Sequence, residues 1–464
     1  MPSPNVKETA ASVPLTEIAG WGGYPVTATR LVPLLDPAGL GALREPRALR
    51  GNGRSYGDAA ALANGWTVSA LPRNRFLAFD RERGILRAET GITVGEALRI
   101  AVPAGWTLPV VPGTKHATLG GCIASDVHGK NHLEAGTFSQ CIVSFRLRLA
   151  DGNEIVCSRE TFPDVFWATC GGMGLTGYAS EVTLQLRPVE SPLLATRSVF
   201  CCDLEACLSA LAFDQEYTHS AAWVDGFATG KKLGRSVVLR GRHATAEEAC
   251  GMQGGGSMTT IATPVSASAN IEIPRGMPGI FLQPFAMRLF SRMHLASQAR
   301  LCSREPALST FDSFFFPLDA IGHWNRLYGK RGFVQHQCVL PSRTAAEGLR
   351  MVLESLHGAG ISSFLAVLKA TGAEAGPLSF PLPGFTLALD LPRVNPGLNG
   401  ALDQIDERIA ALGGRIYLAK DSRMRAETFA AMYPRLAEWL KTKKEIDPMN
   451  LWQTELGRRL RLCA

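Results

Sequence analysis

Two glycine-rich segments carry residues suited to holding a phosphorylated ligand. The first spans residues 50–58 and reads RGNGRSYGD. Its three glycines allow backbone conformations with positive φ, which gather N–H groups into a concave site for phosphate oxygens. Arg54 and Ser55 add side-chain donors. An ordinary surface turn would have the same composition, so this segment alone leaves both interpretations open.

The second segment combines Pro112-Gly113, Gly120-Gly121 and the stretch HGKNH, which starts at His128. Pro-Gly is a turn signal, and paired glycines permit close approach of the backbone to a ligand. His128 could be a core histidine, a metal ligand or a group that faces an active site. The stretch lacks the HExxH arrangement of zinc enzymes and has no accompanying carboxylate cluster. We therefore predict no metal site.

A third glycine motif, GMGLTG over residues 172–177, matches the GxGxxG pattern of dinucleotide-binding proteins. A Rossmann fingerprint requires a strand before the glycines and a helix after them. Here a helix-like segment (163–169) precedes the motif, and a strictly alternating, strand-like segment (179–186) follows it. Because the order is inverted, we reject nicotinamide binding of the Rossmann type.

The elements that must position these segments are of mixed type. Strand patterns cover residues 85–89 and 143–149, and Asp151-Gly152-Asn153 predicts a hairpin turn with a return strand over 154–157. The character of the chain changes near residues 188–192. Beyond this point, strand-like segments fall at 314–316, 333–340, 364–368 and 385–391, and helix-like segments at 344–356 and 402–412.

Three stretches carry weaker signals. Residues 1–20 are predicted to be a tail, and residues 251–278, rich in Gly, Ser, Thr, Met and Pro, a mobile loop. Residues 280–295 are apolar with two arginines, which fits either a core helix or a surface that faces lipid.

Composition limits the function classes. The net charge of the 464 residues is +7, but the basic residues are scattered, so we predict no nucleic-acid partner. The 11 cysteines form no CxxC pair, which favours reduced thiols in a cytoplasmic protein. The N-terminal stretch lacks the apolar core of a signal peptide, and no apolar run reaches the ~18 residues of a membrane span.

Taken together, the first two segments resemble the FAD-binding domain of the vanillyl-alcohol-oxidase (PCMH) type in both order and spacing. The motifs GRSYGD, PVVPGT, GGCIASDVHGKNH, FWATCGGMGLTG, PLSFPLPGF, YLAKDSR and MYPR extend the resemblance to the decaprenylphosphoryl-β-D-ribose 2′-oxidase family, from about Trp21 to the C-terminus. The resemblance implies an α+β fold of two domains. Residues 1–190 would form the FAD-binding domain, residues 191–412 an α+β substrate cap, and residues 413–464 a return that completes the first domain.

The resemblance also implies the residues that contact FAD. They are Leu49, Arg50, Gly51, Asn52, Gly53, Arg54, Ser55, Tyr56, Gly57, Asp58, Ala59, Gly113, Thr118, Leu119, Gly120, Gly121, Ser125, Asp126, Val127, His128, Ala179 and Tyr417. Members that attach FAD covalently carry a histidine in the first segment, where this chain has Arg54 or Ser55. We therefore expect FAD to be bound non-covalently.

The same resemblance assigns catalytic roles to Lys420, His128 and Tyr56. An ammonium beside the flavin would stabilise the negative charge that develops when hydride arrives, although Lys420 could instead be a surface lysine. The substrate contacts implied are Lys130, Trp223, Phe315, Asn325, Gln335, Gln337, Lys369 and Lys420.

The chain departs from the family pattern at three places. Ala388 replaces a cysteine of the mycobacterial members, and Phe315 replaces a tyrosine. The lead-in to the first segment, residues 37–49, is shorter than usual. These departures bear on the lipid-sugar substrate more than on the flavin.

The function implied is oxidation of the C2′ hydroxyl of decaprenylphosphoryl-β-D-ribose to a 2′-keto sugar, the first half of an epimerisation to decaprenylphosphoryl-arabinose. A short-chain reductase would be the partner that completes it. We expect a cytoplasmic protein, with contact to the inner membrane as a peripheral protein if the substrate is a lipid. Two alternatives stay open: an FAD-linked oxidase of another sugar alcohol or an aldonolactone, and a non-catalytic flavin-binding partner of a reductase.

Overall fold

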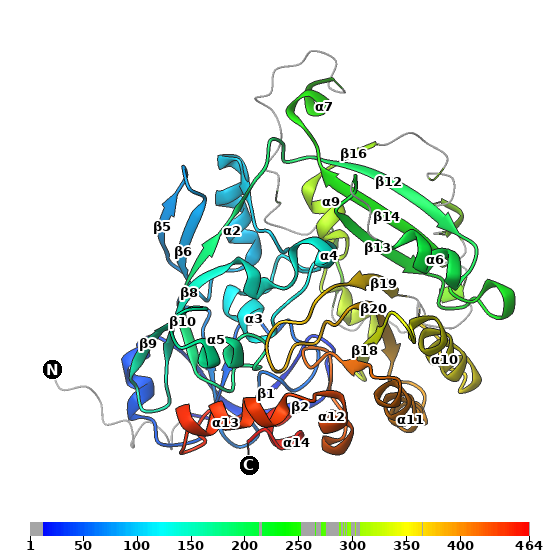
Figure 1. Ribbon diagram of the computed structural model, residues 1–464. Helices are drawn as coiled ribbons and strands as arrows, with labels where there is room; N and C mark the ends of the chain where they lie inside the picture. The colour runs from blue at the N-terminus through cyan, green and yellow to red at the C-terminus, as the bar shows by residue number, and fades with distance from the viewer. Residues whose placement is uncertain are drawn as a thin grey trace.

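The computed structural model describes residues 13–212, 216–251, 265, 271–274, 287–288, 291, 293, 295–297, 302, 307–363 and 365–463. Helices and strands alternate along these residues, so the fold mixes α and β elements (Figure 1). No helix in this part of the chain is long and apolar enough to cross a membrane.

Two sheets are built mainly from the first 190 residues. The first has the order β1 (Thr16–Ala19), β2 (Val26–Pro33), β4 (Trp66–Ser69) and β3 (Arg47–Arg50). The second has the order β5 (Phe76–Asp80), β6 (Ile85–Glu89), β10 (Tyr178–Gln185), β8 (Ile142–Arg148) and β9 (Glu154–Cys157). The helices of this part are α2 (Val94–Ala101), α3 (Leu119–Ala124), α4 (His132–Ala135) and α5 (Pro163–Thr169).

An eight-stranded sheet follows. Its order is β16 (Ala307–Ser309), β12 (Leu194–Cys201), β14 (Ser236–His243), β13 (His219–Val224), β19 (Ala366–Thr371), β20 (Gly384–Pro392), β18 (Phe333–Pro341) and β21 (Arg415–Ile416). The helices α6 (Leu204–Ala210), α10 (Ala345–Gly358) and α11 (Leu398–Ala411) pack against it (Figure 1). Two further helices of this region are α7 (Ala246–Gly251) and α9 (Phe311–Phe315).

The chain ends with helices α12 (Ala426–Met432), α13 (Leu436–Ile446) and α14 (Glu455–Arg459). Figure 1 shows α13, in red, next to α5, and these two helices are in contact. Hydrogen bonds fix this return: the Arg47 N–H donates to Leu451 O over 2.8 Å, and the Trp439 indole N–H donates to Ala168 O over 2.8 Å. The C-terminal segment thus packs on the N-terminal part of the fold.

Most of the predicted elements are confirmed, including β6, β9, α5, β18 and β20. The strand predicted over residues 314–316 is wrong, because these residues belong to helix α9 or follow it. Thr310 caps that helix by accepting a hydrogen bond from Ser313 N, and Phe311, Phe314 and Phe315 then share one buried helical face.

The weaker predictions have mixed outcomes. The predicted tail is too long, since strand β1 begins at Thr16 and pairs with β2. Most of residues 251–278 and 280–295 lies outside the described residues. Within them, Ile271–Glu272 forms a short strand (β15) beside β17 (Ile321–Gly322), and Met287, Ser291 and Leu295 are buried.

Candidate active site

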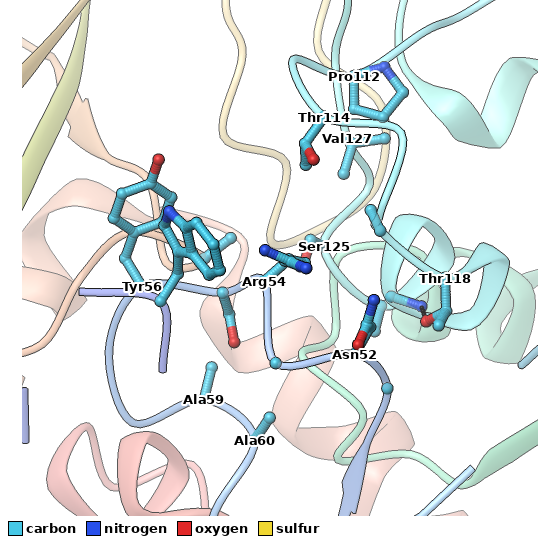
Figure 2. A pocket seen from close by; sticks show the side chains of 18 of the residues that line it. Asn52, Arg54, Tyr56, Ala59, Ala60, Pro112, Thr114, Thr118, Ser125 and Val127 are labelled. Atoms are coloured by element: carbon cyan, nitrogen blue, oxygen red, sulfur yellow. Dashed lines mark hydrogen bonds between the residues drawn. The ribbon is translucent and has the colours of Figure 1, made fainter. Parts of the chain in front are cut away.

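The first and second glycine segments enclose one cavity of about 340 Å³ between the N-terminal part of the fold and the eight-stranded sheet. Figure 2 shows its two walls, with Tyr56 and Ala59 on the first loop and Pro112 and Thr118 on the second. The other end of the cavity is lined by β18, β19 and β20 and by residues 417–420 of the C-terminal return. Stretches that lie far apart in the sequence therefore meet at one place.

Backbone and side-chain contacts hold the two loops together. The Asn52 amide donates to His116 O over 2.9 Å, which ties the first loop to the second. A Cβ at Gly51 would lie 2.4 Å from Thr118 Oγ1, and Gly53 has a φ of +61°. These glycines are needed because a side chain would clash at the first and strain the backbone at the second.

The cavity fits an elongated phosphorylated cofactor. Thr118 caps α3 by accepting from Gly121 N over 3.1 Å, and Gly120 and Gly121 of its first turn line the cavity. A Cβ at Gly121 would meet only Thr118 Oγ1 within 4 Å among the described residues, so the backbone is open to a ligand. Arg54 Nε and His128 Nδ1 are buried and have no hydrogen-bond partner in the described part of the chain.

The three predicted catalytic residues gather at the cavity. Lys420 Nζ lies 3.7 Å from the centroid of the Tyr56 ring. Burial lowers the pKa of Lys420 to about 7, partly opposed by Asp390 and reinforced by Lys369. The charged form of the Lys420 side chain is therefore destabilised before any anion binds.

His128 is held as a neutral imidazole. Its Nε2 accepts from the Gln337 side-chain amide over 3.1 Å, and Gln337 also donates to Thr386 Oγ1 over 3.1 Å. Burial, followed by Lys369, lowers the pKa of His128 well below its usual value. With Nε2 accepting, the ring proton sits on Nδ1, the atom that has no protein partner in the described residues.

Strand register explains which cap residues reach the cavity. Val367 on β19 pairs with Ala388 on β20, and Ala388 pairs with Gln337 on β18. Directly opposed residues share a face of a sheet, so these three line the cavity as one row. Lys369 lies two residues from Val367 and lines the same wall, where burial lowers its pKa to about 8.

The structure brings most of the predicted residues to this cavity. Those that line it are Leu49, Arg50, Gly51, Asn52, Gly53, Arg54, Ser55, Tyr56, Ala59, Gly113, Thr118, Gly120, Gly121, Ser125, Val127, His128, Ala179, Tyr417, Gln335, Gln337, Lys369 and Lys420. Those predicted to contact FAD that lie outside its lining are Gly57, Asp58, Leu119 and Asp126.

Four predicted substrate contacts also lie outside the lining. Phe315 packs in an aromatic cluster, with its ring centroid 5.3 Å from that of His219. Lys130 donates to Phe314 O, and Asn325 donates to Trp21 O over 3.0 Å. Trp223, on the next strand β13, pairs directly with Val367. Val367 lines the cavity and Trp223 does not.

Sequence reasoning missed several lining residues. Leu365 lies just before strand β19 and Val367 lies on it, and the register of that strand was not visible in the sequence. Ala388, noted in the sequence only as a departure from the family pattern, also lines the cavity. Gly174 and Gly177, from the rejected GxGxxG motif, also line the cavity. They precede strand β10, which confirms the inverted order of elements and shows that glycines can approach a ligand site outside a Rossmann unit.

Comparisons with known proteins agree with this geometry. Residues 42–158 match the model of an FAD binding domain. The chain is 32% identical over 463 residues to the decaprenylphosphoryl-beta-D-ribose oxidase of Mycolicibacterium smegmatis, covering 96% of this chain and 97% of the relative. It is 34% identical over 380 residues to an uncharacterized protein of Streptomyces coelicolor, covering 80% of this chain and 100% of that protein.

A shorter similarity links the chain to a protein of different name. It is 29% identical over 115 residues to the human delta(24)-sterol reductase, covering 25% of this chain and 22% of the reductase. The similarity to the ribose oxidase spans nearly the whole length of both chains, and the cavity fits the cofactor of that family. The chain belongs to the decaprenylphosphoryl-β-D-ribose oxidase family, and it is an FAD-dependent oxidoreductase.

Proposed function

We propose that this enzyme oxidises the C2′ hydroxyl of decaprenylphosphoryl-β-D-ribose, or of a close polyprenyl-phosphate sugar, to the 2′-keto sugar. The observation that carries the proposal is a pair of lysines, Lys369 and Lys420, in the cavity wall. The name of the mycobacterial relative gives the same substrate. A sugar joined to a lipid by phosphate has the negative charge that this wall can bind.

The environment of the two ammonium groups favours an anionic ligand. Burial lowers the pKa of Lys369 to about 8 and that of Lys420 to about 7, so both are destabilised as cations. A phosphate or sugar oxygen at this wall would restore their charged form. Lys130 is a third basic side chain near this wall. Burial lowers its pKa, and the positive charge of Lys369 lowers it further.

When FAD is bound, its isoalloxazine ring supplies the acceptor for the hydride of C2′. Protonated Lys420 then places positive charge where negative charge develops. Tyr56, beneath the ammonium, and the Gln337–His128 pair keep the surrounding polar groups fixed. The proton of the hydroxyl leaves to a base or to solvent; the lowered pKa of His128 makes that imidazole a weak base.

We also propose the division into an FAD-binding domain (1–190 with 413–464) and a substrate cap (191–412). The sheets support it, because the eight-stranded sheet starts at Leu194 and the C-terminal helices pack on the N-terminal part. Strand β21 (Arg415–Ile416) pairs with β18 in the cap sheet, which favours a boundary after Ile416. The cavity lies between these two parts, and ligand sites are common at the interface between domains.

The proposed product requires further steps. A 2′-keto sugar becomes the epimeric alcohol only when a second enzyme delivers hydride to the other face, so a short-chain reductase is the proposed partner. A polyprenyl tail stays in a bilayer, which would bring this enzyme to the cytoplasmic surface of the inner membrane as a peripheral protein.

We expect the FAD to be released by acid. The first loop, residues 49–59, contains neither histidine nor cysteine. Precipitation of the yellow holoprotein with acid should leave all the flavin in the supernatant, measured by its absorbance. Flavin that remains with the washed protein pellet would show covalent attachment.

The substrate proposal is tested by anaerobic mixing of the FAD-loaded protein with polyprenylphosphoryl ribose. Loss of the oxidised-flavin absorbance supports the proposal. Loss of absorbance with an aldonolactone or a soluble sugar alcohol instead would favour another oxidase activity. A flavin that no alcohol reduces would favour a non-catalytic partner.

A further inference from the structure

One arginine near the C-terminus joins the two loops that carry Tyr56 and Lys420. Arg459 is the last residue of α14, and its guanidinium contacts Asp58 and Asp421 together. Building on the proposed function, we infer that Arg459 is a positioning residue, which holds the Lys420 ammonium over Tyr56 by clamping Asp58 and Asp421.

The contacts form a closed clamp. Arg459 Nε and Nη2 donate to the two carboxylate oxygens of Asp58 over 3.0 and 2.8 Å. Its Nη1 donates to Asp421 Oδ2 over 2.7 Å and to Met424 O over 2.8 Å. A bidentate pair of this kind fixes direction as well as distance, which a lysine in the same place could not do.

Both carboxylates are tied closely to the active-site residues. Asp58 follows Tyr56 by two positions, and Asp421 directly follows Lys420. Asp58 is 5% exposed and Asp421 is 4% exposed. Asp421 Oδ1 also accepts from the backbone N–H groups of Arg423 and Met424 over 3.0 and 2.9 Å. Without the guanidinium, however, both buried carboxylates would lose the cation that they share, and their repulsion would favour separation of the loops.

The backbones of the two loops already touch. The Tyr56 N–H donates to Ala419 O over 3.0 Å. A Cβ at Gly57 would lie 2.0 Å from Asp421 O, so the loops pass with no room for a side chain. Any separation at the carboxylates is therefore transmitted to the contact of 3.7 Å between Lys420 Nζ and the Tyr56 ring.

The helix that carries Arg459 is anchored to the first loop. Thr454 caps α14 by accepting from Gly457 N over 2.9 Å. Glu455 Oε1 accepts from Ala63 N over 2.9 Å, and Glu455 N donates to Ala61 O over 2.9 Å. The clamp thus starts from a fixed base rather than from a free chain end.

The test uses sulfite, a nucleophile that adds to flavin N5 and needs no sugar. The adduct is anionic, so positive charge beside the flavin favours it. We expect Arg459→Met to weaken sulfite binding to the FAD-loaded enzyme about tenfold, in the same direction as Lys420→Met. Arg459→Lys should restore only part of the affinity, because it cannot bridge both carboxylates.

A double-mutant cycle separates positioning from general stability. If Arg459 acts through Lys420, Arg459→Met should not weaken sulfite binding further in the Lys420→Met background. The matched control is Arg458→Met, which removes an exposed arginine from the same helix and should leave sulfite affinity unchanged. Because sulfite replaces the sugar, a wrong substrate proposal would not affect these results.

The inference is overturned if Arg459→Met lowers only the melting temperature and leaves sulfite affinity within about twofold of the wild type. If Arg459→Met does not retain FAD, Asp421→Asn decides the question, since it removes one ion pair and keeps the side-chain shape. Weakened sulfite binding in Asp421→Asn that vanishes in the Lys420→Met background supports the clamp, and unchanged binding refutes it.

Discussion

Replacing Lys420 with methionine is expected to slow reduction of the flavin by substrate about 10²- to 10³-fold while FAD stays bound. Methionine keeps much of the volume of the side chain but removes the charge that lies 3.7 Å from the Tyr56 ring. The rate of flavin bleaching in single-turnover mixing measures the effect. Lys441→Met, at an exposed site on α13, is the matched control and should react at the wild-type rate.

The role of Lys420 also predicts how the rate of flavin reduction changes with pH. Burial lowers the pKa of Lys420 to about 7, so the ammonium is lost as the pH rises through that value. If the charged form is the active one, the second-order rate constant for flavin reduction, which reports the enzyme before substrate binds, should fall above about pH 7. Lys420→Arg stays protonated and should lack that decline. A Lys420→Met variant that reduces its flavin at the wild-type rate would contradict the role.

Replacing Gly121 with valine is expected to weaken FAD binding about 10- to 100-fold without unfolding the protein. Gly121 lines the cavity in the first turn of α3, and a Cβ there meets only Thr118 Oγ1 within 4 Å among the described residues. A valine side chain would therefore extend into the space proposed for the cofactor. Titration of the apoprotein with FAD, followed by flavin fluorescence, gives the dissociation constants.

The control for this prediction occupies the same place in another helix. Gly400 is the third residue of α11, as Gly121 is of α3, and it is exposed with no described atom within 4 Å of an added Cβ. Gly400→Val should bind FAD like the wild type. Equal FAD affinity in Gly121→Val and the wild type would mean that the cofactor lies elsewhere.

More of the residues predicted to contact the cofactor than of those predicted in the cap line the cavity. The first and second glycine segments depend on local backbone freedom, which is visible in the sequence of Gly51, Gly53 and Gly121. Lys420 and Tyr417 could be assigned only through the family resemblance, because more than 280 residues separate them from His128. Local sequence patterns do not predict contacts between residues so far apart in the chain.

The cap residues depend on register and helix type, which sequence alone does not set. The three phenylalanines at 314–316 were predicted as a strand. Thr310 instead caps a helix, and this helix places Phe315 in a cluster of aromatic side chains. Trp223 lies in the correct row of the sheet but one strand beyond the cavity. Asp58, predicted to contact FAD, lies outside the cavity lining and pairs with Arg459, which is 401 residues away in the sequence.

The most direct test of the central claim is anaerobic titration of the FAD-loaded enzyme with decaprenylphosphoryl-β-D-ribose. We predict that the flavin is bleached in proportion to the 2′-keto sugar formed. Free ribose and aldonolactones carry no phosphate for the wall that contains Lys369 and Lys420, so we predict that they leave the flavin oxidised. A flavin that stays oxidised with the lipid-linked ribose, yet is bleached by dithionite in the same sample, would contradict the proposed function.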